Sequence, residues 1–242
     1  MPTPVKISAV VENIIHHAVG VKSFIMRPQK PCPKYKPGQF LHLAIDDYDP
    51  SFHWPESRVF SIANSSTRRE KIRIIFSVKG TFTKRMYEDV NEGDILWLKL
   101  PYGSFSFPDN GEEIVLIAGG TGITPFISFL EYAIDKQINS NIKLYYGVRS
   151  PEYLIFDSLL YECEQVLKYF KCHIFIENNA TINAPIIVTK GILSIQKILV
   201  DTFGNPNTIY YLSGPLQMIL NFRRELVANN ISEHKIKIDE WQ

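Results

Sequence analysis

The first hundred residues alternate between apolar and polar side chains in short segments, which is the pattern of half-buried β-strands. Turn-forming residues separate the segments, as at Pro37-Gly38 and Asn91-Glu92-Gly93-Asp94. Short, evenly spaced strands predict an antiparallel barrel or sandwich, here with one short helix at 82–88. The predicted strands are Val5–Asn13, Val21–Arg27, Gln39–Ile45, Arg58–Ala63, Lys71–Lys79 and Asp94–Leu100.

The pattern changes after Pro108-Asp109-Asn110-Gly111, where we place a domain boundary that separates residues 1–108 from 109–242. Apolar strands now alternate with amphipathic helices, which predicts a parallel α/β sheet. The predicted strands are Ile114–Ala118, Ile142–Gly147, Lys171–Glu177, Thr208–Leu212 and Lys235–Ile238. The predicted helices are Pro125–Lys136, Ile155–Lys168, Ser194–Val200 and Leu216–Asn229.

The most informative stretch is Ile114–Pro125, IVLIAGGTGITP. A buried strand runs into three glycines and then a helix, so the backbone is able to approach a ligand closely at the helix N-terminus. This predicts a dinucleotide site. The stretch departs from G-x-G-x-x-G, because Pro125 replaces the third glycine and no acidic residue closes the next strand. A tight strand-to-helix turn without a ligand is therefore the alternative.

Composition narrows the class of protein. The chain has 45% hydrophobic and 21% charged residues and a net charge of +1, so charge gives no argument for nucleic acid or an anionic membrane. We expect no membrane span and no leader segment, which makes the cytoplasm the default compartment. Cys32, Cys163 and Cys172 are too few for a disulfide framework or a four-thiolate cluster. His16 and His17 are interpreted as surface residues, and no metal site is expected.

A second candidate phosphate site lies in the first domain. Alternation along the strand Arg58-Val59-Phe60-Ser61 puts Arg58 and Phe60 on one face and the other two residues on the opposite face. Gly80-Thr81-Phe82-Thr83 opens a short helix, so its N–H groups and Arg58 are able to bind the same phosphate. The alternatives are a solvated strand arginine and a core phenylalanine.

Taken in order, RVFS, GTFT, GGTGITP, YYGVRS (145–150) and LSGPLQMI (212–219) resemble the ferredoxin–NADP reductase superfamily along nearly the whole chain. The resemblance implies an antiparallel flavin-binding β-barrel followed by a parallel-sheet, Rossmann-like NAD(P)-binding domain. It implies hydride transfer from NADPH or NADH to bound FAD, and electron transfer to a separate protein such as ferredoxin, flavodoxin or an oxygenase component. A non-catalytic flavin- or nucleotide-binding subunit is the alternative.

The resemblance also implies roles in flavin binding. Arg58 would pair with a flavin phosphate, Phe60 and its neighbour Val59 would lie along the flavin site, and Ser61 would hydrogen-bond near flavin N5. The pyrophosphate would be cradled by Gly80, Thr81, Phe82 and Thr83. The aromatic residues of the loop Asp46–Ser57 are candidates for stacking on the adenine, with a simple covering loop as the alternative.

In the second domain, the resemblance places four residues of the glycine turn on the nicotinamide nucleotide: Gly120, Thr121, Gly122 and Thr124. Arg149 and Ser150 follow the second strand, where an arginine suits a 2′-phosphate; this favours NADPH and leaves NADH open. Tyr153 is a candidate for the adenine of this nucleotide.

The last motif and the C-terminus supply the remaining candidates. Ser213-Gly214-Pro215 stands where many relatives have Cys-Gly-Pro, so Ser213 is expected near the nicotinamide. Trp241 is expected to shield the flavin, with a frayed terminus as the alternative. Ser61, Ser213 and Trp241 are the candidate catalytic residues. A basic patch for an acidic partner is the final candidate, with an ordinary solvated surface as its alternative: Arg68, Arg69, Lys71, Lys84 and Arg85.

Overall fold

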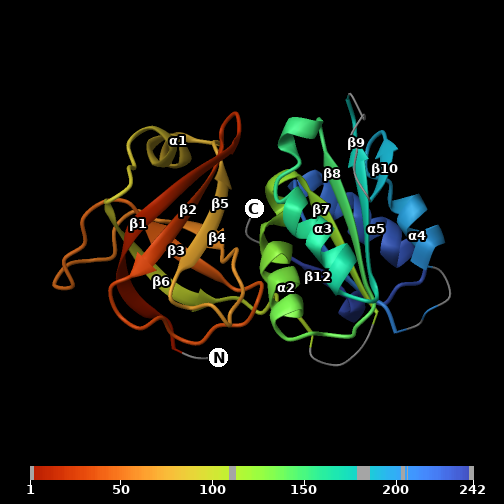
Figure 1. Ribbon diagram of the computed structural model, residues 1–242, viewed down its shortest axis with the longest axis horizontal. Helices are drawn as coiled ribbons and strands as arrows, with labels where there is room; N and C mark the ends of the chain where they lie inside the picture. Colours follow the sequence, from red (N-terminus) through yellow and green to blue (C-terminus); the bar gives the residue numbers. More distant parts are fainter. Residues whose placement is uncertain (1–2, 109–112, 179–185, 203–204, 206, 240–242) are drawn as a thin grey trace. The chain divides into compact units, whose positions relative to one another are not determined.

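The computed structural model describes residues 3–108, 113–178, 186–202, 205 and 207–239. Contacts divide the chain into two units (Figure 1). The first is Met1–Phe107 together with Ile127–Tyr132, and the second is Pro108–Phe126 together with Ala133–Gln242. Among the described residues, no helix is long and apolar enough to cross a membrane.

The first unit is built on a six-stranded antiparallel sheet with the order β4-β3-β6-β1-β2-β5. The two edge strands approach each other just beyond β4, where the Ala63 N–H donates to the Arg73 carbonyl (2.8 Å). The sheet is therefore nearly closed, which confirms the predicted barrel. Its elements are β1 (Val5–Ala18), β2 (Val21–Pro28), β3 (Phe40–Ala44), β4 (Arg58–Ser61), β5 (Ile72–Ser77), α1 (Thr81–Glu88) and β6 (Ile95–Tyr102).

Strand β1 is longer than the sequence predicted, and it pairs with both β2 and β6. Its buried positions Ile7, Ala9 and Val11 alternate as expected for one sheet face over a core. Register shifts follow between Val11 and Asn13 and between His16 and Ala18. These irregularities break the strict alternation, so the end of the strand was not visible in the pattern.

The second unit is a six-stranded parallel sheet with the order β10-β9-β8-β7-β11-β12, which confirms the predicted α/β architecture. Its strands are β7 (Ile114–Gly119), β8 (Ile142–Val148), β9 (Phe170–Ile176), β10 (Ile187–Lys190), β11 (Ile209–Ser213) and β12 (Ile236–Ile238). Its helices are α2 (Thr124–Asp135), α3 (Asp157–Val166), α4 (Ile195–Thr202) and α5 (Leu216–Ala228), with short 3-10 turns at Gly120–Ile123, Pro151–Tyr153 and Glu233–Lys235.

The order of this sheet reverses beside β7. The chain moves outward from β7 through β8, β9 and β10, and then returns to β11 on the other side of β7. In open parallel sheets, ligands bind at such a switch point, outside the carboxyl ends of the strands. Those ends are Gly119 on β7 and Ser213 on β11. The topology therefore places GGTG and SGP together.

Candidate functional site

The glycine turn after β7 presents open backbone. Residues Gly120–Ile123 form one 3-10 turn, and α2 begins at Thr124, whose hydroxyl donates to the Thr121 carbonyl (2.7 Å). Gly120 has a φ of +53°, and a Cβ added there would meet no heavy atom within 4 Å. A side chain would therefore project into open space beside a helix N-terminus, which is where an anion binds favourably. This turn fits a dinucleotide phosphate.

Two other glycines of the motifs, Gly122 and Gly214, stand where a side chain would clash with neighbouring atoms. A Cβ on Gly122 would lie 2.3 Å from the Ser213 carbonyl oxygen, and one on Gly214 would lie 2.6 Å from Met218 Cε. Gly214 also has a φ of +155°, which L side chains rarely adopt. The turns after β7 and β11 therefore pack backbone against backbone. Their contact with a nucleotide stays a prediction.

Ser213 is fully buried, and its hydroxyl donates to Asp239 Oδ2 (3.1 Å). The Asp239 N–H in turn donates to the Leu212 carbonyl (2.9 Å). The Asp239 carboxylate therefore lies beside Ser213, the first residue of the Ser213-Gly214-Pro215 turn. Pro215 precedes α5, and its carbonyl accepts the N–H of Ile219 (3.1 Å). Trp241 lies outside the described residues.

Opposite charges follow β8. Arg149 is exposed, and its carbonyl accepts the N–H of Asn178 (2.8 Å). A side-chain hydrogen bond from Ser150 is the main reason that the pKa of Glu152 is lowered, so this carboxylate is ionised near neutral pH. Glu152 is an acidic residue that was not predicted from the sequence, because it lies beyond the strand end, within the 3-10 turn Pro151–Tyr153.

In the first unit, the strand motif and the helix motif meet. The Arg58 guanidinium carbon lies 5.0 Å from the centre of the Phe82 ring, and Arg58 Nη2 donates to Glu56 Oε1 (2.7 Å). Phe60 is half-buried and packs edge-on to Phe76, with ring centres 6.2 Å apart. Ser61 and Val59 are also half-buried. The two motifs, separated by the eighteen residues 62–79, therefore lie side by side in the fold.

The start of α1, like the glycine turn after β7, has a glycine with open space where a side chain would stand. Thr83 Oγ1 accepts the N–H of Lys79 (2.9 Å) and of Gly80 (3.1 Å), which fixes the entry to the helix. A Cβ on Gly80 would meet no heavy atom within 4 Å. Thr81 is exposed at the first helical position. An open glycine, a helix N-terminus and the nearby Arg58 fit a phosphate group.

The aromatic loop before β4 is only partly open. Tyr48 is buried, with ring centres 5.1 Å from Trp54 and 5.2 Å from Trp97, and its hydroxyl accepts from Lys6 Nζ (2.6 Å). Phe52 is 74% exposed. A stacking role on adenine is therefore better suited to Phe52 than to Tyr48.

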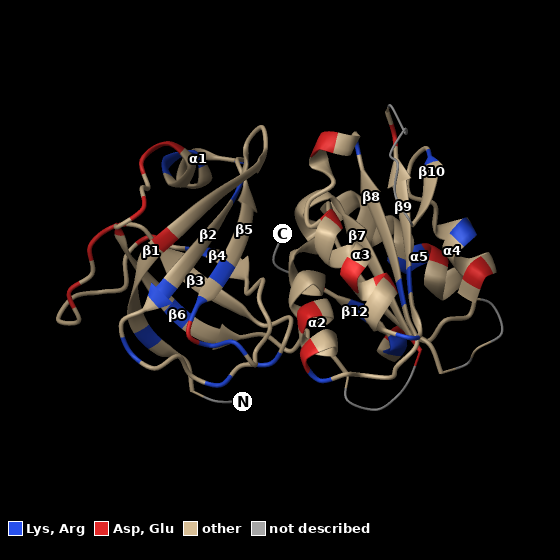
Figure 2. Ribbon diagram, viewed as in Figure 1, with Lys and Arg blue, Asp and Glu red and all other residues tan. Residues whose placement is uncertain are grey.

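The predicted basic patch divides into two groups. The cations before β5 and those on α1 lie at opposite ends of that strand (Figure 2). Lys71 pairs with Glu12 (2.8 Å), and Arg85 pairs with Asp46 (2.6 Å). Lys84 lies 3.9 Å from the carboxylate of Glu88. The patch is thus neither continuous nor purely basic.

The interpretation of His17 as a surface residue is wrong. Its ring is half-buried and its Nε2 hydrogen-bonds to the buried hydroxyl of Ser23 (2.6 Å). Burial lowers the pKa of His17. The neighbouring His16 is exposed. His17 lies at the register shift between His16 and Ala18, where the strict alternation of a regular strand does not apply.

Comparison with known proteins agrees with this geometry. Residues 116–224 match the family model "Oxidoreductase NAD-binding domain". The chain is 29% identical to the sulfhydrogenase 2 subunit gamma of Pyrococcus furiosus over 84% of this chain and 70% of that protein. It is 26% identical to the reductase component of propane 2-monooxygenase from Mycolicibacterium smegmatis, over 91% of this chain and 63% of that protein.

Among solved structures, a ferredoxin NADP⁺ reductase from Neisseria gonorrhoeae with bound FAD and NADP is similar to the chain with a TM-score of 0.76. The identity is 19%, and the alignment covers 99% of each chain. The fold is therefore the same over the full length of both. Residues 116–224 therefore match the oxidoreductase NAD-binding domain, and the chain as a whole has the fold of this ferredoxin NADP⁺ reductase.

Proposed function

We propose that the protein is a flavoprotein oxidoreductase that takes a hydride from NADPH or NADH onto bound FAD and passes electrons to a separate acceptor. A ferredoxin, a flavodoxin or an oxygenase component would be such an acceptor. One observation carries the proposal. Gly80 and Gly120 each stand open at the start of a helix, one beside the barrel and one at the switch point of the parallel sheet. The chain thus offers two phosphate sites.

The barrel would hold the flavin. Arg58 would neutralise phosphate charge, and the N–H groups of Thr81 and Phe82 would donate to phosphate oxygens at the N-terminus of α1. Phe60 would offer an apolar surface to the ring system, and Ser61 would supply a hydroxyl beside it. When bound, FAD supplies the step that accepts a hydride and releases electrons to an acceptor.

The parallel sheet would hold the nicotinamide nucleotide. The N–H groups at Gly120 and Thr121 would receive the pyrophosphate, assisted by the positive end of α2. Arg149 would bind a 2′-phosphate, whereas the carboxylate of Glu152 would accept a ribose 2′-hydroxyl. We propose that the protein prefers NADPH, and that Glu152 is the residue that would favour NADH instead. We retain Ser213 and Trp241 as proposed neighbours of the nicotinamide and the flavin.

The three cysteines support a reducing compartment such as the cytoplasm. All three lie within the described ranges as buried thiols. Burial raises the pKa of the Cys32 thiol to about 11, so it stays protonated and unreactive at neutral pH. Disulfides are rare in the cytoplasm, where thiols of this kind persist.

Flavin binding by an Arg58 variant tests the proposal. Loss of one charge-assisted hydrogen bond of about 1.5–3 kcal/mol weakens binding by roughly 10- to 100-fold. We expect Arg58→Ala to raise the Kd for FAD by this factor in a titration followed by flavin fluorescence. Arg27→Ala is the matched control, since Arg27 pairs with Glu12 elsewhere on the barrel. Equal FAD affinity in all three proteins would contradict the proposed flavin site.

A further inference from the structure

Side chains from distant parts of the first unit hold the segment Ala63–Ser65, which follows β4. Arg73 Nη2 donates to the Ala63 carbonyl (2.6 Å), and the Ala63 N–H donates to the Arg73 carbonyl (2.8 Å). The Arg73 N–H donates to Asn64 Oδ1 (2.8 Å). Asn64 Nδ2 in turn donates to the carbonyls of Arg68 and Lys71, each at 2.9 Å. Arg73 therefore binds this segment through both its main chain and its side chain.

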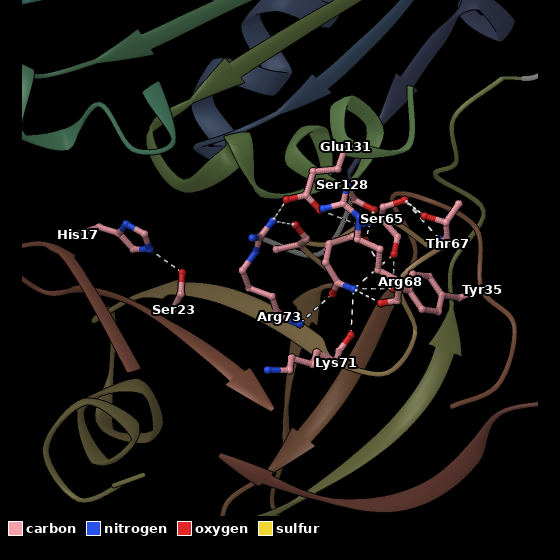
Figure 3. Close-up of polar contacts among 12 residues, drawn as sticks. His17, Ser23, Tyr35, Ser65, Thr67, Arg68, Lys71, Arg73, Ser128 and Glu131 are labelled. Carbon is pink, nitrogen blue, oxygen red and sulfur yellow. Dashed lines mark hydrogen bonds and ion pairs between the residues drawn. The ribbon is translucent and has the colours of Figure 1, made fainter. Parts of the chain in front are cut away.

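Helix α2 completes the arrangement through its residues Ile127–Tyr132, which belong to the first unit (Figure 3). Glu131 Oε1 accepts from Arg73 Nη2 (2.5 Å), and Glu131 Oε2 accepts the N–H of Ser65 (3.0 Å). The Ser128 hydroxyl donates to the Asn64 carbonyl (2.8 Å). We call the pair Arg73 and Glu131 the clasp.

The clasp is largely withdrawn from water, with side-chain exposures of 16% for Arg73 and 11% for Glu131. Taking two charges out of water costs about as much as their attraction returns, so such a pair is weak support for stability alone. Buried charges do fix position, because charge-assisted hydrogen bonds have narrow geometry. The groups fixed here are the main chain of residues 63–65, which one residue, Ile62, separates from Phe60 and Ser61.

We propose that Arg73 and Glu131 are positioning residues for the flavin: they fix the main chain of Ala63–Ser65 and thereby the end of β4 that carries Phe60 and Ser61. The inference rests on the proposed flavin site. It adds a requirement that no motif of the sequence contains, namely that a carboxylate from α2 sets the shape of the flavin-binding edge of the barrel.

The test compares three variants with the wild type. Glu131→Gln keeps the size of the side chain but removes the charge. The double variant Arg73→Met, Glu131→Met replaces both charges by apolar groups of similar length, which commonly restores stability. Arg27→Met is the matched control, because Arg27 forms an ion pair of the same length (2.5 Å) with Glu12 between β2 and β1. Measurements are the thermal midpoint of the flavin-free protein, the Kd for FAD, and the visible circular dichroism of bound FAD.

We expect Glu131→Gln to weaken FAD binding about tenfold, as for the loss of one buried hydrogen bond, and to change the visible dichroism. The double variant should regain the thermal midpoint without regaining the affinity or the dichroism, because the Ala63 carbonyl and the Ser65 N–H still lack these partners. Arg27→Met should match the wild type in affinity and dichroism.

Three outcomes overturn the inference, and the failure of the inference alone is distinguishable from the failure of the proposed function. If the double variant recovers wild-type stability, affinity and dichroism together, or if Glu131→Gln alters only the thermal midpoint, the clasp acts on stability and not on the flavin. If the wild type itself takes up no FAD, the proposed function fails and the inference fails with it.

Discussion

At the scale of single residues, the proposed function assigns the choice between NADPH and NADH to two charges after β8, those of Arg149 and Glu152. A 2′-phosphate and Arg149 would form a charge-assisted pair of about 1.5–3 kcal/mol. Arg149→Ala should therefore raise the KM for NADPH by roughly 10- to 100-fold and leave the KM for NADH almost unchanged. Steady-state kinetics with an artificial acceptor measure both constants.

The neighbouring carboxylate provides the matched control. Glu152→Gln should lower the KM for NADPH relative to NADH, because an ionised carboxylate repels a 2′-phosphate and accepts a 2′-hydroxyl. Equal changes of both KM values in Arg149→Ala would show that Arg149 does not bind the 2′-phosphate.

At the scale of elements, glycines at two turns should behave differently when a methyl group is added. Gly122→Ala brings Cβ to 2.3 Å from the Ser213 carbonyl oxygen, so we expect a loss of about 1–3 kcal/mol from overpacking. Gly80→Ala meets open space and has an extended φ of −166°, so its stability should change by less than about 0.5 kcal/mol. Its FAD affinity should nevertheless fall, since the methyl group occupies the proposed phosphate space.

Urea unfolding of the flavin-free protein and FAD titration separate the two effects. A Gly80→Ala variant with wild-type affinity for FAD would contradict the proposal that phosphate lies against this glycine. Unchanged stability in Gly122→Ala would show that the turns after β7 and β11 are able to move apart.

Helix α4 packs beside a histidine that should make stability depend on pH. His173 Nε2 hydrogen-bonds to Thr189 Oγ1 on β10 (2.8 Å), and it faces Lys197 and Asp201 of α4 and Tyr145 of β8. Burial is the largest cause that lowers the pKa of His173 below its ordinary value of 6.5; Lys197 acts in the same direction and Asp201 opposes both.

The direction in which stability changes with pH follows from the numbers of protons that the folded and unfolded states bind. Because the folded pKa is lowered, the unfolded state binds more protons below about pH 6.5. The stabilising contribution of the neutral ring is complete above this pH and decreases as the pH falls through the range below it. Calorimetry between about pH 7.5 and 5.5 should show a smaller fall in thermal midpoint for His173→Gln than for the wild type. Parallel curves for the two proteins would contradict this assignment.

At the scale of the whole molecule, the two units share α2. Phe129 of this helix is fully buried and stacks on Phe105, with ring centres 5.7 Å apart, while Glu131 pairs with Arg73. A fragment ending at Phe107 lacks both side chains. Their loss costs roughly 3–5 kcal/mol each, against a total stability of about 5–15 kcal/mol for a typical domain.

We therefore expect the fragment 3–107 to lack cooperative unfolding in urea, followed by near-ultraviolet circular dichroism. The full chain with Phe129→Ala serves as the intermediate case, since it retains Glu131. A fragment that unfolds cooperatively at the urea midpoint of the intact chain would show that α2 contributes nothing to the first unit.

Local patterns in the sequence predicted the features that depend on neighbouring residues, namely individual strands, turns and helices. The apolar run Ile114–Ala118, the glycines after it and Pro125 identified β7, its turn and α2, and the alternation before residue 108 identified the barrel. The misses have other causes. Strand β10 (Ile187–Lys190) is four residues long with an exposed Ile187, so its short apolar run shows neither clear alternation nor the length of a buried strand. The partnership of Arg73 and Glu131 joins residues 58 positions apart and depends on the tertiary fold.

The most direct test of the proposed activity is an anaerobic visible spectrum of the protein reconstituted with FAD, before and after addition of NADPH and then of NADH. The two proposed phosphate sites, at Gly80 and Gly120, predict a flavin absorption band that bleaches rapidly with one of the nucleotides. A protein that takes up no flavin, or a bound flavin that neither nucleotide reduces, would contradict the reductase function and favour a non-catalytic binding subunit.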